Sequence, residues 1–114
     1  MDRRAAVRDY YDAIDAGDYD RLRDLLAPGF VQHRPDRTFD GRDRFVEFMR
    51  EERPRTDTEH LIDEMCVGDS GAVDGATVFV RGRLRAVDGD ELFGFVDVHR
   101  LAGRRIRSLT TYTT

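Results

Sequence analysis

Asp97 is the residue whose surroundings point most directly to chemistry. The run 93–101 is typical of a β-strand, in which successive side chains face opposite sides. The residues that would share the face of Asp97 are Phe93, Phe95, His99 and Leu101. A carboxylate in line with two phenylalanines is costly to bury as an ion, so it must be paired, hydrogen-bonded or protonated. Asp97 is therefore an acid or hydrogen-bond donor with a raised pKa, or it is a structural carboxylate. In the second case it bridges a histidine or a backbone group, or it faces solvent.

His33 is the second candidate. It lies in a short predicted strand, 30–34, on the face opposite Phe30 and Gln32. Histidine titrates near neutral pH and is the commonest general acid–base group in enzymes. On an apolar strand face it can equally be a hydrogen-bonded core residue. If His33 faced Asp97 across a pocket, the carboxylate would fix the imidazole tautomer and raise its basicity.

Tyr10 is the third candidate. It belongs to an apolar helical stripe with Val7, Tyr11 and Ile14, which recur at the spacing of one helix face. Packing alone is a sufficient reason for that position, but a buried tyrosine hydroxyl also seeks a hydrogen-bond partner. Tyr10 is therefore either a core residue or a hydroxyl that faces a pocket, and Tyr11 is its rival for both roles.

The remaining histidines and the cysteine bear on metal binding. His99 would point the same way as Asp97 and could be a second pocket histidine, whereas His60 lies in an early strand of ambiguous phase. The histidines form no close pair at the spacing of metal ligands, and Cys66 is the single cysteine. We therefore expect no metal site and no internal disulfide.

Arginines alternate along another predicted strand at Arg81, Arg83 and Arg85. They can form a solvated outer face or a dimer contact, or a guanidinium can reach an anionic substrate. The sequence contains no phosphate-binding glycine loop and no serine nucleophile elbow.

Helices in the first half and strands in the second must position these side chains. The predicted helices span 2–16, 18–27 and 41–53, and the predicted strands span 30–34, 57–67, 76–87, 91–101 and 105–113. Asp18 and Asp40 are the candidate N-caps of the second and third helices. Turn residues at 68–71, 88–90 and 102–103 separate the late strands, and Asp-Gly in the second of these breaks predicts a hairpin.

This order of elements predicts the fold class. Helices segregated from an antiparallel sheet define an α+β domain. We expect one domain over residues 1–114, with a cone-shaped, curved antiparallel sheet wrapped around three N-terminal helices. The mouth of such a cone would be a pocket.

The charge pattern narrows the possible partners. The 114 residues include no lysine, and the net charge is −4. Adaptation to a salty cytosol and the codon usage of a GC-rich genome both account for this composition. An acidic balance argues against nucleic acid as a partner, and no apolar run approaches the roughly 20 residues of a membrane helix. The charged N-terminus is unlike a signal peptide, so we expect a cytoplasmic protein without a membrane partner.

Several short motifs give the chain a family resemblance. It resembles the nuclear transport factor 2-like superfamily, and within it the SnoaL-like polyketide cyclases and the ketosteroid isomerases. The resemblance runs over nearly the whole chain and rests on DYYDAIDAGDYDRLRDLLAPGFVQHRP, FDGRDRFVEFM and GFVDVHRLAGRRIRSL. It implies the cone-shaped fold described above. Because that fold hosts isomerases, cyclases, dehydratases, epoxide hydrolases and non-enzymes, it implies less about the reaction.

The resemblance also implies roles for three residues. Tyr10 stands seven residues before the glycine of the AGD motif, where ketosteroid isomerases have a tyrosine that donates to the substrate oxyanion. Asp97 stands at the second oxyanion donor of that family, an aspartic acid kept neutral by an apolar site. His33 stands where the family has its general-base aspartate, and a histidine there is similar to the SnoaL-like branch.

We therefore predict an isomerase, cyclase or dehydratase that acts by proton transfer on a small apolar carbonyl compound, without a cofactor. Its catalytic residues would be Tyr10, His33 and Asp97, and its substrate contacts would be His99, Phe95, Phe30 and Phe48. A ligand-binding or structural domain with the same cavity and no turnover is the alternative. We expect a homodimer through the outer face of the sheet, to which residues 108–114 would contribute.

Overall fold

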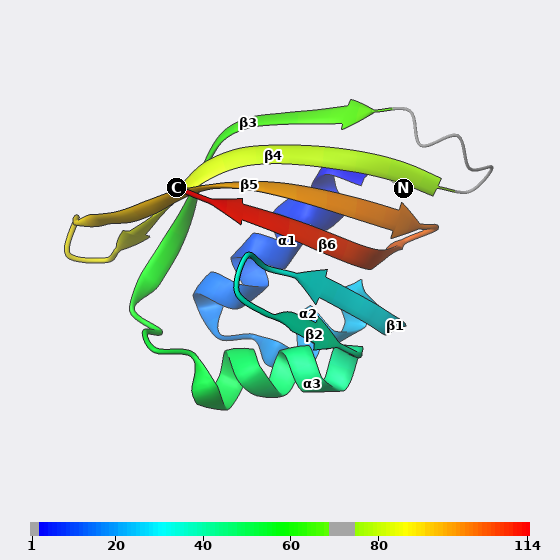
Figure 1. The fold of residues 1–114 in the computed structure, drawn as a ribbon, viewed down its shortest axis with the longest axis horizontal. Helices are drawn as coiled ribbons and strands as arrows, with labels where there is room; N and C mark the ends of the chain where they lie inside the picture. The colour runs from blue at the N-terminus through cyan, green and yellow to red at the C-terminus, as the bar shows by residue number, and fades with distance from the viewer. Residues whose placement is uncertain (1–2, 69–74) are drawn as a thin grey trace.

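The computed structural model describes residues 3–68 and 75–114, and most of the predicted break at 68–71 lies outside them (Figure 1). The helical elements are α1 (Arg3–Ala16), α2 (Tyr19–Leu25), α3 (Arg42–Glu47) and the π-helical turn η1 (Phe48–Glu52). The strands are β1 (Leu26–His33), β2 (Thr38–Asp40), β3 (Thr58–Gly68), β4 (Gly75–Ala86), β5 (Glu91–Ala102) and β6 (Arg105–Thr113). None of the described helices is long and apolar enough to span a bilayer.

One curved, unclosed sheet contains all six described strands in the order β2-β1-β6-β5-β4-β3. The predicted antiparallel meander of the late strands is confirmed, because β4 pairs with β5 and β5 with β6 in antiparallel register. One pairing of the expected antiparallel sheet differs, since β1 runs parallel to β6. The helices lie on the concave side of the sheet (Figure 1), so the α+β class is as expected.

The first two helices form where the sequence predicts them. The apolar stripe of α1 is buried from Val7 to Ile14. Gly17 follows α1 with φ of 69°, a left-handed conformation that glycine adopts without steric cost. Asp18 caps α2, because its carboxylate accepts a hydrogen bond from the backbone N–H of Arg21 at 3.2 Å.

The third helix differs from the prediction at both ends. Asp40 is the last residue of β2, a three-residue strand that the sequence did not reveal, and Gly41 takes the N-cap position without a side-chain cap. The predicted helix 41–53 divides into α3 and the wider turn η1. Such turns often mark functional sites, because they redirect the side chains that follow them.

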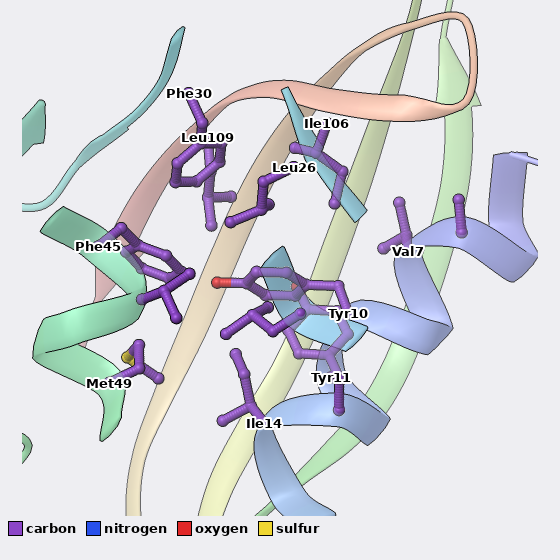
Figure 2. Packing of buried hydrophobic residues seen from close by; sticks show 14 of the residues in the cluster. Val7, Tyr10, Tyr11, Ile14, Leu26, Phe30, Phe45, Met49, Ile106 and Leu109 are labelled. Carbon is purple, nitrogen blue, oxygen red and sulfur yellow. The ribbon is translucent and has the colours of Figure 1, made fainter. Parts of the chain in front are cut away.

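The core lies between α1, α3 and the concave face of the sheet. Figure 2 shows the Tyr10 side chain of α1 directed toward Phe45 of α3, with Met49 of η1 on the same side of the core. Other buried core residues from the strands are Leu26, Phe30, Val78, Val80, Ile106 and Leu109. This packing holds α1 against β3 and β4 and lets the Tyr11 side chain reach β5, where the candidate site is built.

Candidate functional site

A cavity of about 710 Å³ opens between α1, the end of β1, the segment after η1 and the inner face of the sheet. Its apolar lining includes Ile14, Met49, Leu84 and Phe95, and its polar lining includes Tyr10, Gln32, Arg34, Arg53, His60 and Asp97. The volume lies in the range of small-molecule sites. The hollow therefore combines apolar walls with several groups that can donate or accept protons.

Asp97 is the carboxyl at the inner wall of this cavity. It is 5% exposed, and it accepts a hydrogen bond from the Tyr11 hydroxyl at 2.6 Å and from the Thr111 hydroxyl at 2.6 Å. Burial raises the pKa of Asp97, and the two hydrogen bonds oppose that shift without cancelling it. A carboxyl with a raised pKa is suited to exchange protons closer to neutral pH than an ordinary aspartate.

His99 lies behind Tyr11 and is fully buried. Its Nε2 atom is 2.8 Å from the Tyr11 hydroxyl oxygen. Burial lowers the pKa of His99 from its ordinary value of 6.5 to about 3, so the imidazole is neutral near pH 7. Its Nδ1 atom has no hydrogen-bond partner among residues 3–68 and 75–114.

The Tyr11 hydroxyl has one proton to share between Asp97 and His99. If Tyr11 donates to an ionised Asp97, then Nε2–H of His99 donates to the tyrosine oxygen. If Asp97 is protonated, it can donate to the tyrosine oxygen while Tyr11 donates to Nε2. The chain of three groups can therefore accept either protonation state of Asp97 without losing a hydrogen bond.

A second chain of hydrogen bonds leads from Asp97 to an arginine. The Gln32 amide donates to the Thr111 hydroxyl at 3.0 Å, and the Arg34 Nε–H donates to the Gln32 carbonyl oxygen at 2.8 Å. Each donor in this series is directed toward the carboxyl, so the guanidinium polarises the bonds between it and Asp97. The series also fixes the Gln32 and Thr111 side chains in the cavity wall.

Tyr10 lines the cavity beside Tyr11. It is 3% exposed, and its ring makes edge contacts with the Tyr11 ring at 5.0 Å and with the His99 ring at 5.2 Å between centroids. Burial raises the pKa of Tyr10 above its ordinary value, and Asp97 adds to the shift, so the phenol is a proton donor at neutral pH. Within the described part of the chain its hydroxyl has no hydrogen-bond partner, which leaves it free for a ligand.

His60 forms a pair with Asp15 at another wall of the cavity. The His60 Nδ1 atom lies 2.6 Å from Asp15 Oδ1, and the backbone N–H of His60 donates to Asp15 Oδ2 at 2.9 Å. A carboxylate at Nδ1 fixes the tautomer that carries its proton there, which leaves the lone pair on Nε2. Because His60 lines the cavity, this pair can supply a base to it.

The structure brings some of the predicted site residues together and separates others. Tyr10, Asp97 and Phe95 line the cavity, and His99 is buried beneath Tyr11 rather than exposed to it. The prediction that His33 shares this hollow is wrong, because His33 is exposed and its Nδ1 atom faces the Thr38 hydroxyl at 3.4 Å. Phe30 and Phe48 are core residues outside the lining, in ring contact with other phenylalanines.

Sequence reasoning missed the residues that take the place of His33. Gln32 is buried on the inner face of β1, as the predicted alternation with Phe30 required, and the next inward residue is Arg34. The pair of His60 with Asp15 joins residues 45 positions apart, and a register shift in β3 removes the regular alternation from that strand. No described group of three or more His, Cys, Asp or Glu side chains is arranged to hold a metal ion.

The comparison with protein families agrees with this architecture. The SnoaL-like domain matches residues 7–109. This chain belongs to the SnoaL-like domain family. No curated protein matches the chain.

Several solved structures share the fold of this SnoaL-like domain. An NTF2-like protein of unknown function from Cytophaga hutchinsonii has a TM-score of 0.76 at 14% identity, over 100% of this chain and 91% of that one. A candidate polyketide cyclase from Sinorhizobium meliloti has a TM-score of 0.76 at 19% identity, over 95% and 94%. The Orange Carotenoid Protein of Anabaena, in a structure binding canthaxanthin, has a TM-score of 0.78 at 20% identity, over 93% and 34%. At these identities the likeness shows the fold alone.

Proposed function

We propose that this SnoaL-like domain catalyses proton transfer at the carbon next to a carbonyl group of a small molecule held in the cavity. The observation that supports it is the meeting of three kinds of group at one hollow. These are a buried carboxyl (Asp97), an unpartnered phenol (Tyr10) and an imidazole oriented by a carboxylate (His60 with Asp15).

His60 takes the role of the base in this proposal. The C–H bond next to the carbonyl breaks, its proton moves to Nε2 of His60, and the bonding electrons form an enolate. Asp15 holds the Nδ1–H and stabilises the imidazolium that results. Return of the proton from His60 to the same carbon regenerates the ketone, and its delivery to another carbon of a conjugated enolate gives an isomer.

Asp97 and Tyr10 stabilise the enolate oxygen in the same step. A neutral Asp97 and the Tyr10 hydroxyl donate hydrogen bonds to the oxygen as negative charge develops there. Burial favours the neutral carboxyl, and its single proton turns from the Tyr11 oxygen to the enolate oxygen while Tyr11 keeps its hydrogen bond to Nε2 of His99. The cavity wall is therefore suited to hold the proton that the oxygen needs.

Deuterium exchange tests this function directly. A panel of ketones is incubated with the protein in deuterated water, and incorporation next to the carbonyl is followed by NMR. We expect the wild type to accelerate exchange of at least one ketone, with losses of roughly 100-fold or more for His60→Gln and for Asp97→Asn. His33→Gln is the matched control and keeps the full rate, because that side chain lies outside the cavity. A wild type no faster than His60→Gln on every ketone would contradict the proposal.

A ligand-binding domain without turnover is the second candidate. The likeness to a protein whose structure binds canthaxanthin favours it, because a fold like this one is found in a protein that binds an apolar molecule. Thermal-shift screening separates the two functions. Compounds that raise the melting temperature and are recovered without exchange or isomerisation support the binding domain.

We also propose that two copies associate through the outer face of the sheet. Phe79, Val96 and Tyr112 are 40%, 38% and 58% exposed there, and Val96 lies opposite Tyr112 in the β5–β6 register. The neighbouring Arg81 already pairs with Glu64 of its own chain at 2.5 Å. An apolar patch bordered by satisfied ion pairs has the composition of a protein–protein interface.

A further inference from the structure

Two arginines in the cavity have no acidic partner. Arg34 and Arg53 both line the hollow, and no carboxylate within the described residues forms an ion pair with either of them. Arg55, a third arginine of the lining, differs because it holds Asp57 with two hydrogen bonds, of 3.0 and 2.6 Å. Cationic side chains inside a cavity and without a counter-ion are suited to an anionic ligand.

Arg34 is held in place by groups that leave its charge uncompensated. Its Nε–H donates to Gln32, and its Nη2 atom lies 3.8 Å from the Met49 sulfur. The guanidinium carbon also lies 5.2 Å from the ring centroids of Phe39 and Phe48. Burial lowers the pKa of Arg34. These contacts orient the planar guanidinium, and an anion would supply the missing charge.

Arg53 follows η1 and is only partly exposed. Its Nε atom is buried and has no hydrogen-bond partner in the described part of the chain. A buried donor without a partner is destabilising, because it has lost its hydrogen bonds to water. Pro54 follows Arg53 and fixes the direction in which the chain leaves the turn. A ligand acceptor at this position would satisfy the donor.

Asp36 is the acid on the same rim that could compete for these arginines. Its side chain is mostly exposed, and its ion pair is with Arg37, at 3.7 Å. Both Arg34 and Arg53 lower the pKa of Tyr10 against the larger effect of burial, so their charges act on the site where the carbonyl oxygen is placed above. The two guanidinium groups therefore belong to the same hollow as the proton-transfer groups.

The geometry points to a keto acid as the substrate class: a molecule with an apolar body, a carbonyl group for Asp97 and Tyr10, and a carboxylate for Arg34 and Arg53. This inference rests on the proposed function for the carbonyl end and on the unpaired arginines for the carboxylate end. Guanidinium groups bind carboxylates through paired N–H donors, which gives orientation as well as attraction. The sequence predicted a small apolar carbonyl compound, and this inference adds one carboxylate to that compound.

A matched pair of probes tests the inference. Binding of 4-oxo-4-phenylbutanoate and of its neutral primary amide is measured by isothermal titration calorimetry, with NMR titration for weak binding. We expect the acid to bind the wild type at least tenfold more tightly than the amide. Arg53→Gln and Arg34→Gln should each reduce that ratio to below threefold. The affinity of the acid should also fall with added sodium chloride, whereas that of the amide should stay constant.

Arg50→Gln is the control, because Arg50 lies exposed on the same turn and pairs with Glu51 at 3.5 Å. It should leave the ratio unchanged. Arg34→Gln also removes a hydrogen bond from Gln32, so Arg53→Gln, with a melting temperature like that of the wild type, is the deciding variant. Equal binding of acid and amide by the wild type overturns the inference, as does an unchanged ratio in Arg53→Gln.

The same probes separate this inference from the proposed function. If the protein accelerates deuterium exchange of the amide but binds the acid no more tightly than the amide, the carboxylate site is overturned and the proton transfer is retained. Tight, arginine-dependent binding of the acid supports the carboxylate site, and if no ketone of the panel exchanges faster with the wild type, the proton transfer is overturned while the carboxylate site stands.

Discussion

The Tyr11 hydroxyl lies 2.6 Å from Oδ2 of Asp97 and joins helix α1 to strand β5 across 86 residues of sequence. The same hydroxyl oxygen contacts Nε2 of His99. One proton donor thus serves two buried polar groups, and its loss affects both of them.

Tyr11→Phe should lower the free energy of unfolding by about 1–3 kcal/mol, because it leaves the buried His99 without a partner and leaves Asp97 with only its hydrogen bond from Thr111. Urea denaturation followed by circular dichroism measures the change. Tyr112→Phe is the control, since that tyrosine is 58% exposed on the outer face of the sheet. Equal stability of Tyr11→Phe and the wild type would contradict the role given to this hydroxyl.

His99 should make the protein less stable as the pH falls. Its pKa is about 3 in the folded state and about 6.5 when unfolded, so the unfolded chain binds the proton more readily between these values. The stabilisation is complete above pH 6.5 and is lost toward pH 3, by about 1.4 kcal/mol per pH unit. Denaturation curves of the wild type and of His99→Gln, taken from pH 7 to pH 4, measure this slope.

Asp97 acts in the opposite direction in that experiment. Because its pKa is raised in the folded state, the folded protein gains stability as the pH falls toward the unfolded pKa of about 3.9. The relevant quantity is therefore the difference between wild type and His99→Gln, which is the part of the slope that requires the imidazole. Parallel curves for the two proteins over this range would count against a buried neutral His99.

Gly82→Ala should destabilise the wall of the cavity. A Cβ atom at this position would lie 2.4 Å from the backbone oxygen of Leu61 and 2.8 Å from the ring of Phe95. One contact is with the backbone of β3, so the strands must shift, at a cost of about 1–3 kcal/mol. Thermal unfolding measures the loss. Gly29→Ala, where a Cβ would meet nothing within 4 Å, is the control, and an equal melting temperature for the two variants would refute the prediction.

Val96→Glu should convert the proposed dimer into a monomer, because it places a charge in the apolar outer face. Light scattering coupled to gel filtration measures the mass. Val87→Glu changes an apolar residue in the β4–β5 turn that is 66% exposed, and it should leave the mass unchanged. A wild type that is monomeric at about 100 μM would exclude this interface.

The sequence predicted most of the secondary structure because clear turn residues separate its strands. The predicted strands 76–87, 91–101 and 105–113 each end within one residue of β4, β5 and β6, since Asp-Gly and Ala-Gly mark the turns between them. The strand β2 escaped prediction because three residues carry no periodicity. Its pairing with β1 depends on the turn between them, which the sequence pattern alone did not define.

Site residues were predictable from the sequence where side-chain alternation along one strand determines which face they occupy. They were missed where the site depends on a contact between two elements distant in sequence. Asp97 was placed on the inner face of β5 by counting from Phe95, and the structure has it there. The same alternation in β1 puts His33 opposite the buried Phe30, whereas the family resemblance implied a catalytic position for it. The contact of Asp15 with His60 joins a helix to a strand with a register shift, and no local pattern reports such a contact.

The parallel pairing of β1 with β6 has a consequence for biosynthesis. During translation, residues 26–33 emerge from the ribosome long before residues 105–113, which are the only described neighbours that join β1 to the rest of the sheet. The edge of β1 that pairs with β6 therefore has no hydrogen-bond partner until residues 105–113 have been synthesised. Contacts so distant along the chain slow folding, so nascent chains of this domain should depend on chaperones more than chains whose neighbouring segments pair first.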